Sequence, residues 1–237
     1  PAGLAAAQQL NRAGHWVTVF EKSDRVGGLL IYGIPNFKLE KSHVLRRVKL
    51  LEDEGVRFVC KTHVGQNISV STLKADFDVI LLAGGAEHGR DINVPGRELI
   101  GIHYAMDFLP QQTKRCLGDL VPEQISAAGK HVVVIGGGDT GSDCIGTSLR
   151  QGALSVTSLE LMPEPPAERI ATNPWPQWSR IKRVSSSHEE GGRVIYAANT
   201  KSFVGQNGQV TAMKVAQVEW KPNPGGAPFQ EVPGTEF

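Results

Sequence analysis

The sequence predicts an α/β protein in which helices and strands alternate, and two segments support this fold class. His131–Leu161 contains a complete strand, glycine-rich turn, helix and second strand, in that order. Leu4–Phe20 contains the second half of a similar unit, an alanine-rich helix closed by Gly14 and followed by a short strand. Helices that connect strands are typical of parallel sheets. Both segments therefore favour dinucleotide-binding domains of the Rossmann type, of which the first is incomplete.

The glycine-rich turn carries the strongest functional pattern. Val132–Ile135 predicts a strand buried on both faces, and Gly136, Gly138 and Gly141 follow it with the spacing G-x-G-x-x-G. The first glycine of this pattern permits a tight turn, the second lets the backbone approach a pyrophosphate, and the third lets the helix pack closely on the strand. The helix is expected to end before Gly152, a left-handed stop. The alternative interpretation is a tight turn that binds nothing.

An acidic residue completes this pattern. Glu160 ends the second strand, Ser155–Leu161, roughly twenty residues after the last glycine, where this fold places an acid that binds the ribose hydroxyls. A carboxylate there would oppose a 2′-phosphate by about 4 kcal/mol per unit charge pair at 4 Å and an effective dielectric constant near 20. The pattern therefore favours NADH over NADPH. In the alternative, Glu160 points to solvent and a nearby cation accepts the extra phosphate: Arg169, Arg180, Lys182 or Arg183.

The beginning of the chain predicts a second dinucleotide site. Gly3 stands where the third glycine of the pattern would be, and Glu21 ends the following strand at the position of a ribose acid. The strand and the first two glycines that would complete this site do not occur before Pro1, and residues 231–237 show no element that closes a domain. We expect the chain to be an internal piece of a longer protein.

Two further glycine pairs divide the N-terminal half. Gly27 and Gly28 form a turn at which backbone can approach a ligand closely. Gly84 and Gly85 follow a predicted buried strand, Asp78–Leu82, and would let the chain cross to another domain beside a cofactor, although a tight turn explains them almost as well. The predicted domains are residues 1–88 and 89–237.

The remaining elements are predicted from periodicity and turn residues. Gln206–Gln209 contains Asn-Gly, a hairpin signal that joins strands on either side. The polar stretch around His188 is expected to be a solvated loop. The other predictions are a loop at Tyr32–Leu39, a helix at Glu40–Gly55, strands at Val56–Cys60 and near Val64, a helix near Tyr104–Cys116 and a strand at Arg193–Ala197.

Composition excludes several classes of protein. The 237 residues carry a net charge of +1, which gives no field to attract nucleic acid or an anionic membrane, and no apolar run approaches the length of a membrane helix. The three cysteines, Cys60, Cys116 and Cys144, form no C-x-x-C pair, which argues against an iron–sulfur cluster or zinc site in this chain. Cytoplasmic localisation is expected, or a plastid if the source is eukaryotic.

Several longer motifs carry a resemblance to a known family. The chain contains, in this order, PAGLAAA, VFEKSDRVGGLLIYGIPNFKLEK, LLAGGAEHGRDINVPG, VVVIGGGDTGSDC, LELMPEPP and NPWPQW. With these motifs it resembles the small (β) subunits of glutamate synthases and the matching C-terminal region of the fused NADH-dependent enzymes. A related NAD(P)H:ferredoxin-type flavin oxidoreductase is the alternative.

The resemblance implies two Rossmann-like domains, the first for FAD and the second, inserted into it, for NADH or NADPH. It assigns Gly3 and Glu21 to the FAD pattern, places Gly27, Gly28 and Leu29 along the flavin, and makes Gly84 and Gly85 the first crossing between domains. Gly136, Gly138, Asp139, Thr140 and Gly141 would hold the nicotinamide dinucleotide.

The implied reaction is hydride transfer from nicotinamide to flavin. Electrons would then pass through iron–sulfur clusters in regions outside this chain to the large (α) subunit or domain, where glutamine and 2-oxoglutarate yield glutamate. Hydride transfer to flavin needs no protein acid or nucleophile, so no catalytic residue is predicted.

Two alternatives stay open. These 237 residues could be a nucleotide-binding fragment that lacks FAD and is inactive alone, because half of the FAD pattern is absent.

The role of the Pro/Trp-rich loop after Glu160 has two interpretations. The loop exposes Trp175 or Trp178 for docking of the partner subunit, or it packs them over the adenosine site or the domain edge.

Overall fold

The computed structural model describes residues 1–221 and 229–237, and the chain divides into two compact units. The first unit comprises Pro1–Gly89 and Leu109–Glu123, and the second comprises Arg90–Phe108 and Gln124–Phe237. Helix α4 (Ala105–Cys116) contains the point at which the chain returns to the first unit. The predicted domains, 1–88 and 89–237, differ from these units in the return segment and stay a prediction.

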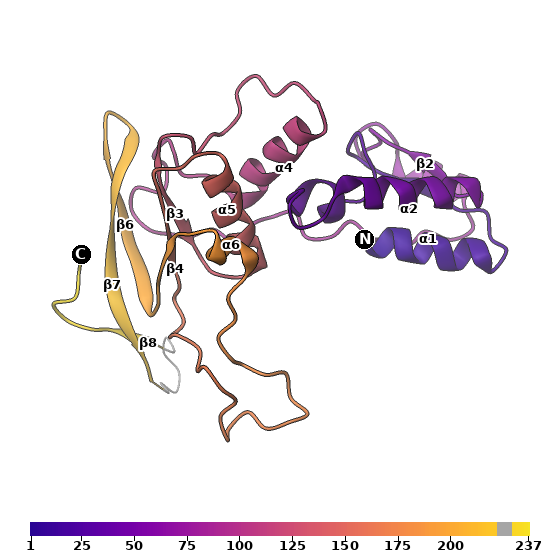
Figure 1. Ribbon diagram of the computed structural model, residues 1–237. Helices are drawn as coiled ribbons and strands as arrows, with labels where there is room; N and C mark the ends of the chain where they lie inside the picture. Colours follow the sequence, from indigo (N-terminus) through magenta and orange to yellow (C-terminus); the bar gives the residue numbers. More distant parts are fainter. Residues whose placement is uncertain (222–228) are drawn as a thin grey trace. The chain divides into compact units, whose positions relative to one another are not determined.

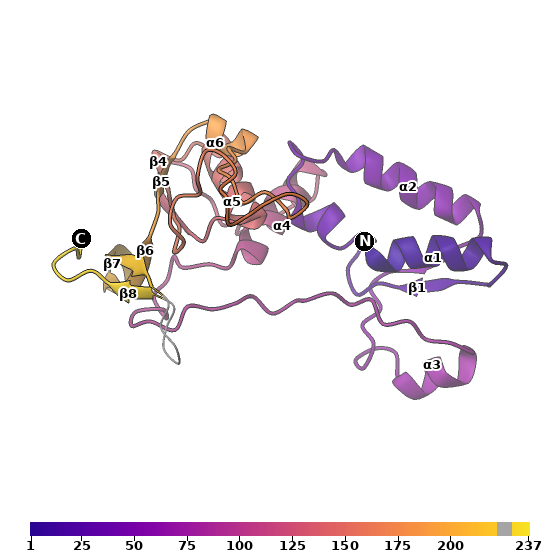
Figure 2. The same cartoon turned by 90° about the horizontal axis from the view of Figure 1, so that it is seen from below.

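The first unit contains a two-stranded parallel sheet with helices against it. Thr18 lies opposite Arg57 in this sheet, and Figure 2 shows α1 alongside β1. Ala7, Leu51 and Val56 form one buried cluster, to which α1 and α2 both contribute. Ile31, Tyr32 and Val44 form another. Its elements are α1 (Ala2–Arg12), β1 (Thr18–Phe20), the π-helix η1 (Leu29–Gly33), α2 (Lys41–Asp53), β2 (Arg57–Val59) and α3 (Val70–Asp76).

The second unit combines a parallel sheet of order β3-β4-β5 with an antiparallel sheet of order β6-β7-β8. Helix α5 packs against β3 and β4 (Figure 1) and buries Ile145. Leu159, Ala198 and Val215 form a cluster that joins the two sheets. The elements are β3 (His131–Ile135), α5 (Asp139–Arg150), β4 (Ser155–Leu159), α6 (Ser186–Glu189), β5 (Arg193–Ile195), β6 (Ala198–Gln206), β7 (Gln209–Trp220) and β8 (Phe229–Glu231).

Parallel pairing confirms the predicted α/β class and the strand–turn–helix–strand unit. His131 pairs with Ser155 and Ile135 with Leu159, and α5 connects the two strands. Gly152 has a φ of +85°, as expected for a left-handed stop. The predicted hairpin is also present, since the antiparallel strands β6 and β7 are joined by Asn207 and Gly208, both at positive φ.

The prediction of a buried strand at Asp78–Leu82 is wrong. This segment belongs to no sheet of the described residues, and Val79 and Leu82 are 82% and 89% exposed. Figure 2 draws it as a plain trace that leads away from α3. An apolar run is compatible with a buried strand but does not ensure one. A strand also needs a neighbouring strand that pairs with its backbone N–H and C=O groups, and this segment has none among the described residues.

The predicted burial of β3 on both faces is wrong as well. Val133 and Ile135 are 46% and 43% exposed, whereas Val132 and Val134 are half-buried. The reason is that β3 lies at the edge of its sheet and α5 covers only one of its faces.

Three local predictions need correction. Tyr32 and Gly33 belong to η1 and not to a loop, and His188 lies in the short helix α6 and not in a solvated loop. Val64 forms only an isolated bridge with Ile68. Each of these elements is short, so the hydrogen bonds of its neighbours decide its structure more than its own sequence pattern does.

The exposed segment gives a test of this fold. Replacing Val79 by Thr and Leu82 by Ser together should change the free energy of unfolding by no more than about 0.5 kcal/mol, because both side chains are already in solvent. The double variant should also bind less of a hydrophobic dye and associate less with itself. Leu51→Ala, in the core, should cost about 2–5 kcal/mol in the same denaturant titration. Destabilisation of the double variant as large as that of Leu51→Ala would show that the segment is buried.

Candidate functional site

The glycine-rich turn has a shape that side chains at its glycines would prevent. Gly136 follows β3 with a φ of +99°, and its N–H donates to the carbonyl of Leu159 at 2.8 Å. A Cβ added at Gly141 would lie 2.3 Å from the carbonyl oxygen of Gly136 and 3.6 Å from Val134. The third glycine of the pattern is therefore required for close packing of α5 on the turn, as the sequence predicted.

The N-terminus of α5 is open to solvent. Gly138 is its N-cap and provides no capping side chain, and Gly138, Asp139 and Thr140 are all exposed. A Cβ added at Gly138 would meet no atom within 4 Å. The first N–H groups of a helix lack partners within the helix and, with the helix dipole, favour an anion. A pyrophosphate could therefore approach the backbone at this point.

Glu160 lies against the same turn. Its backbone is fixed on both sides, since its N–H donates to Ile195 and its carbonyl accepts from Ala198, at 2.8 Å and 2.9 Å. Its carboxylate accepts a hydrogen bond from the N–H of Gly137. Burial nevertheless raises the pKa of this carboxyl above its ordinary value, because the hydrogen bond offsets the loss of solvent only in part.

Gly137 belongs to the same arrangement, although the spacing did not identify it. A Cβ at this position would lie 1.0 Å from Oε1 of Glu160, so the carboxylate occupies the space that a side chain would fill. The only signal in the sequence was that the variable position between Gly136 and Gly138 is also a glycine. The structure thus brings Gly136, Gly138, Gly141 and Glu160 together, while their roles toward a nucleotide stay predictions.

The predicted FAD residues gather around the first turn of α1. A Cβ added at Gly3 would lie 3.3 Å from the Cβ of Ala83, and one added at Gly28 would lie 3.5 Å from Pro1. Gly28 has a φ of +53°, and both Gly84 and Gly85 would meet no atom within 4 Å of an added Cβ. Ala83 therefore lies against the first turn of α1, and the backbone that follows it at Gly84 and Gly85 has little side-chain cover.

Other predicted residues of this site lie nearby in the sequence but have different surroundings. Glu21 follows β1, and its carboxylate accepts from the N–H of Ser23 at 2.8 Å. Leu29 begins η1 and is 55% exposed. Gly27 has a φ of +125°, and an added Cβ would lie 3.2 Å from Ile31, so it is needed where the turn enters the π-helix.

A buried lysine holds this π-helix. Lys41 is 3% exposed, and its ammonium donates to the carbonyl of Leu30 at 2.9 Å and to that of Ile34. π-Helices are rare and frequently lie at functional sites. The last carbonyl groups of a helix have no partner within the helix. Lys41 supplies donors to two such carbonyls from the start of α2. The sequence gave no indication of this role.

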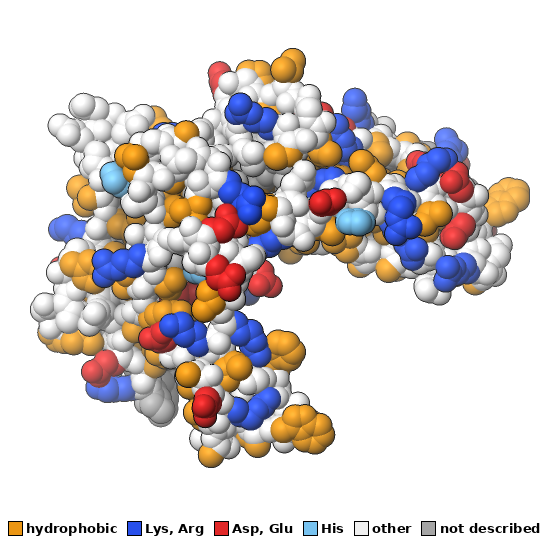
Figure 3. Space-filling model, in the orientation of Figure 1, with side chains coloured by type: hydrophobic (Ala, Val, Ile, Leu, Met, Phe, Trp, Pro, Cys, Tyr) orange, Lys and Arg blue, Asp and Glu red, His pale blue; other side chains and the backbone are white. Residues whose placement is uncertain are grey.

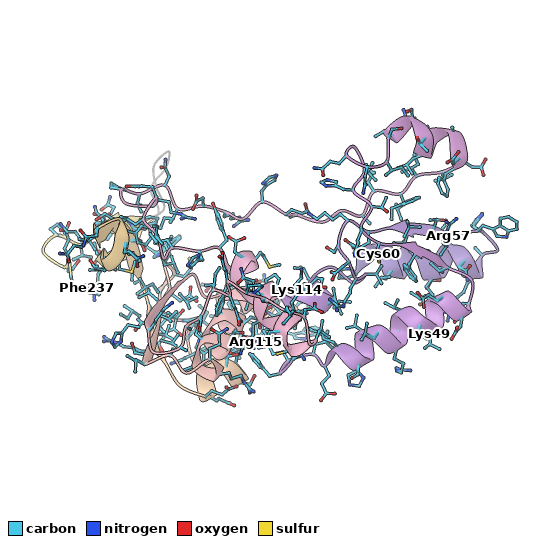
Figure 4. All side chains as sticks on the ribbon, turned by 90° about the horizontal axis from the view of Figure 1, so that it is seen from above. Lys49, Arg57, Cys60, Lys114, Arg115 and Phe237 are labelled. Atoms are coloured by element: carbon cyan, nitrogen blue, oxygen red, sulfur yellow. The ribbon has the colours of Figure 1, made fainter. Side chains whose placement is uncertain are left out.

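A polar network holds the same segment from the other side. Tyr32 donates to Asp24 at 2.5 Å and accepts from Arg25 at 2.7 Å, and Arg25 contacts both carboxylate oxygens of Asp119 at 2.6 Å and 2.7 Å. Burial and the hydrogen bond to Asp24 raise the pKa of Tyr32 to about 12. The ammonium of Lys114, labelled in Figure 4, lies 5.3 Å from the centre of the Tyr32 ring.

Cys144 takes no part in this chemistry. It lies in the buried middle of α5, and burial raises the pKa of its thiol to about 12, far above neutral pH. Its role is packing. Within residues 1–221 and 229–237, no group of three or more His, Cys, Asp or Glu side chains is arranged to hold a metal ion.

Comparison with known proteins places this geometry in a family. The family model for pyridine nucleotide-disulphide oxidoreductases matches residues 1–179, which include the first turn of α1, the glycine-rich turn and Glu160. The chain belongs to this family. No helix of the described residues combines the length and apolar character needed to cross a membrane.

Two relatives confirm the resemblance that the sequence motifs indicated. The chain is 50% identical over 242 residues to the glutamate synthase [NADPH] small chain of Mycobacterium tuberculosis, and all of the chain matches 49% of that protein. It is 49% identical over 247 residues to the glutamate synthase [NADH] of Saccharomyces cerevisiae, of which it covers 11%. The chain thus spans about half the length of the small chains that it matches.

A solved structure supports the fold. FprA from Mycobacterium tuberculosis in complex with NADPH superposes with a TM-score of 0.71 over the whole of this chain and 65% of its own. Sequence identity is 17%, so this likeness concerns the fold alone. It agrees with the parallel sheets and the α/β class, while the division into two Rossmann domains stays a prediction.

Three glycine substitutions separate the three roles at the turn. Gly138→Ala should leave the melting temperature unchanged and abolish binding of dinucleotide, because only a ligand would meet the new methyl group. Gly141→Ala should destabilise the protein, because the methyl group meets backbone at 2.3 Å. Gly137→Ala should retain the fold and displace the flexible carboxylate of Glu160. Calorimetry and nucleotide titration of the three variants check this, and tight binding by Gly138→Ala would exclude a pyrophosphate at this turn.

Lys41 gives a second test. Lys41→Met preserves the aliphatic chain but leaves the carbonyls of Leu30 and Ile34 without this donor, which should lower the free energy of unfolding by about 1–3 kcal/mol. The control is Lys49→Met on the exposed face of the same helix (Figure 4), which should leave the melting temperature unchanged. Equal melting temperatures for the two variants would show that Lys41 does not hold the π-helix.

Proposed function

We propose that this chain is the nucleotide-binding and flavin-binding part of a glutamate synthase of the small-chain type. In this role its second unit takes up NADH, its first unit contributes to the FAD site, and electrons pass on to the large chain. The observation that carries the proposal is the assembly of an open helix N-terminus, the glycine-rich turn and the carboxylate of Glu160 at one place. The identity of about 50% to glutamate synthases supports it.

The residues of the second unit fit a nicotinamide dinucleotide. The N-terminus of α5 presents N–H groups for the pyrophosphate, and the open space at Gly138 lets the phosphates approach. Glu160 already lies over Gly137, so its carboxylate can accept hydrogen bonds from ribose hydroxyls with little movement. We therefore assign Gly136, Gly138, Asp139, Thr140, Gly141 and Glu160 to this nucleotide.

The residues of the first unit fit part of an FAD site. The first turn of α1 at Gly3 lies against Ala83 with no room for a larger side chain, and Gly84 leaves backbone uncovered. Lys41 and the network around Arg25 hold η1, so that Gly27, Gly28 and Leu29 keep one conformation beside the flavin. Glu21 would accept hydrogen bonds from the ribose of the FAD, and Gly85 would mark the crossing between domains.

Geometry is the protein's contribution to this reaction. When bound, NADH and FAD supply the hydride donor and the hydride acceptor. The chain binds and orients them, and no side chain of it needs to transfer a proton for the hydride to move. Iron–sulfur clusters and the synthesis of glutamate from glutamine and 2-oxoglutarate are assigned to regions outside these residues and to the large chain.

The choice between the two nucleotides is the sharpest test. At pH 8 we expect NADH to bind at least tenfold more tightly than NADPH, about 1.4 kcal/mol, because ionised Glu160 repels the 2′-phosphate. The preference should narrow as the pH falls toward 5.5, since burial raises the pKa of Glu160 and a protonated carboxyl carries no charge. Calorimetric titration of the chain with each nucleotide at both pH values checks this.

Glu160→Gln is the matched control for the charge. It retains the size of the side chain and should show little preference at either pH. The 2′-phosphate itself loses negative charge between pH 8 and pH 5.5, because its second pKa lies near 6. Any change in preference that this titration causes alone should also appear in Glu160→Gln. Equal or tighter binding of NADPH by the unsubstituted chain at pH 8 would contradict the assignment of Glu160, and failure to bind either nucleotide would contradict the proposed function.

A further inference from the structure

The loop between β4 and α6 exposes two large aromatic side chains. Trp175 and Trp178 are 82% and 78% exposed, so neither packs over the nucleotide-binding turn of its own unit. Figure 1 shows the segment between these elements as a long excursion from the second unit. We call residues 169–183 of this segment the Trp loop. Tryptophan offers a large apolar area for binding and is enriched at protein interfaces.

The Trp loop is ordered by its own hydrogen bonds. Asn173 is 5% exposed; its side-chain amide donates to Gln177 and to the carbonyl of Trp178, both at 3.1 Å, and its Oδ1 accepts from the N–H of Arg180 at 2.9 Å. Arg169 donates to the carbonyls of Asn173 and Gln177 at 2.9 Å and 3.0 Å. The backbone that carries both tryptophans is therefore held in one conformation before any partner binds, which reduces the entropy lost on binding.

The charge of the Trp loop is positive. The guanidinium of Arg183 lies 4.7 Å from the centre of the Trp178 ring, and Arg180 is exposed beside it. Among the described residues, the one ion pair of the Trp loop joins Lys182 to Glu164, which lies just before it, so Arg180 and Arg183 have no carboxylate partner. Figure 3 shows hydrophobic and basic side chains on the lower part of this surface, with acidic side chains among them. An acidic surface would complement this arrangement.

We propose that the Trp loop docks onto an acidic protein surface of the glutamate synthase large chain. This inference rests on the proposed function, because that function supplies the large chain as the partner. Trp and Arg are the residue types most enriched among those that dominate binding energy. Trp175 and Trp178 would fill apolar pockets, while Arg180 and Arg183 would pair with carboxylates around them. A net charge of +1 for the whole chain argues against nucleic acid as the partner.

The experiment measures binding of the whole chain to the glutamate synthase large chain of the same organism by surface plasmon resonance. Trp178→Ala should weaken binding at least tenfold, and Trp175→Ala together with it should weaken binding further. Trp16→Ala is the matched control, because Trp16 is fully exposed in the first unit. Arg180→Glu should weaken binding and reduce its dependence on salt, whereas Arg46→Glu on α2 should change neither.

Asn173→Ala tests the conformation of the Trp loop. This variant retains both tryptophans and the bonds from Arg169 but loses the side-chain hydrogen bonds of Asn173, so it should bind severalfold more weakly. Titration with NADH confirms that each variant is folded. Unchanged binding by the double tryptophan variant would overturn this inference and leave the proposed function intact. An unsubstituted chain that binds NADH but not the large chain would overturn the proposed partner, and this inference with it.

Discussion

The carboxylate of Glu160 and the missing side chain of Gly137 share one space, and the position of this carboxylate at the glycine-rich turn depends on that contact. The contact needs a parallel neighbour for β3, because pairing of β4 with β3 delivers Glu160 to the level of the turn. It also needs the hydrogen bonds to Ile195 and Ala198 that fix the backbone of Glu160. Glycine is required at three positions of this turn for three different reasons. Gly136 has a positive φ, a side chain at Gly137 would overlap the carboxylate of Glu160, and a side chain at Gly141 would overlap backbone.

In the first unit, buried polar side chains fix the π-helix η1 by hydrogen bonds. η1 is a single short π-helix whose side chains Ile31 and Tyr32 pack against Val44 of α2, and side-chain hydrogen bonds add to this packing. Lys41 bonds to its carbonyls, and Tyr32 connects it to Asp24 and Arg25. Such groups are costly to bury and therefore tolerate few alternative arrangements, which keeps this segment in one conformation.

Patterns within one segment were sufficient to predict much of this structure. The glycine spacing, the acid at the end of β4 and the Asn-Gly turn are local, and the structure contains the elements that they predicted. Predictions that depended on contacts with another element were less successful. Asp78–Leu82 forms a strand only if another strand pairs with it, and the second face of β3 is buried only if another element covers it. The contact of Asp119 with Arg25 joins distant segments, and the contacts of Lys41 join two neighbouring elements; neither leaves a periodic pattern in the sequence.

The bidentate pair of Arg25 and Asp119 also bears on how the chain reaches its folded state. These residues are 94 positions apart, and the intervening chain contains residues of the second unit. At about 5–20 residues per second, a ribosome would make Asp119 roughly 5–20 s after Arg25. Until then the segment around Tyr32 lacks the contacts made by Asp119 and Lys114, and closing so long a loop carries an entropic cost. During synthesis the first unit therefore stays partly formed until residues 109–123 are made, and these residues are made after the first residues of the second unit.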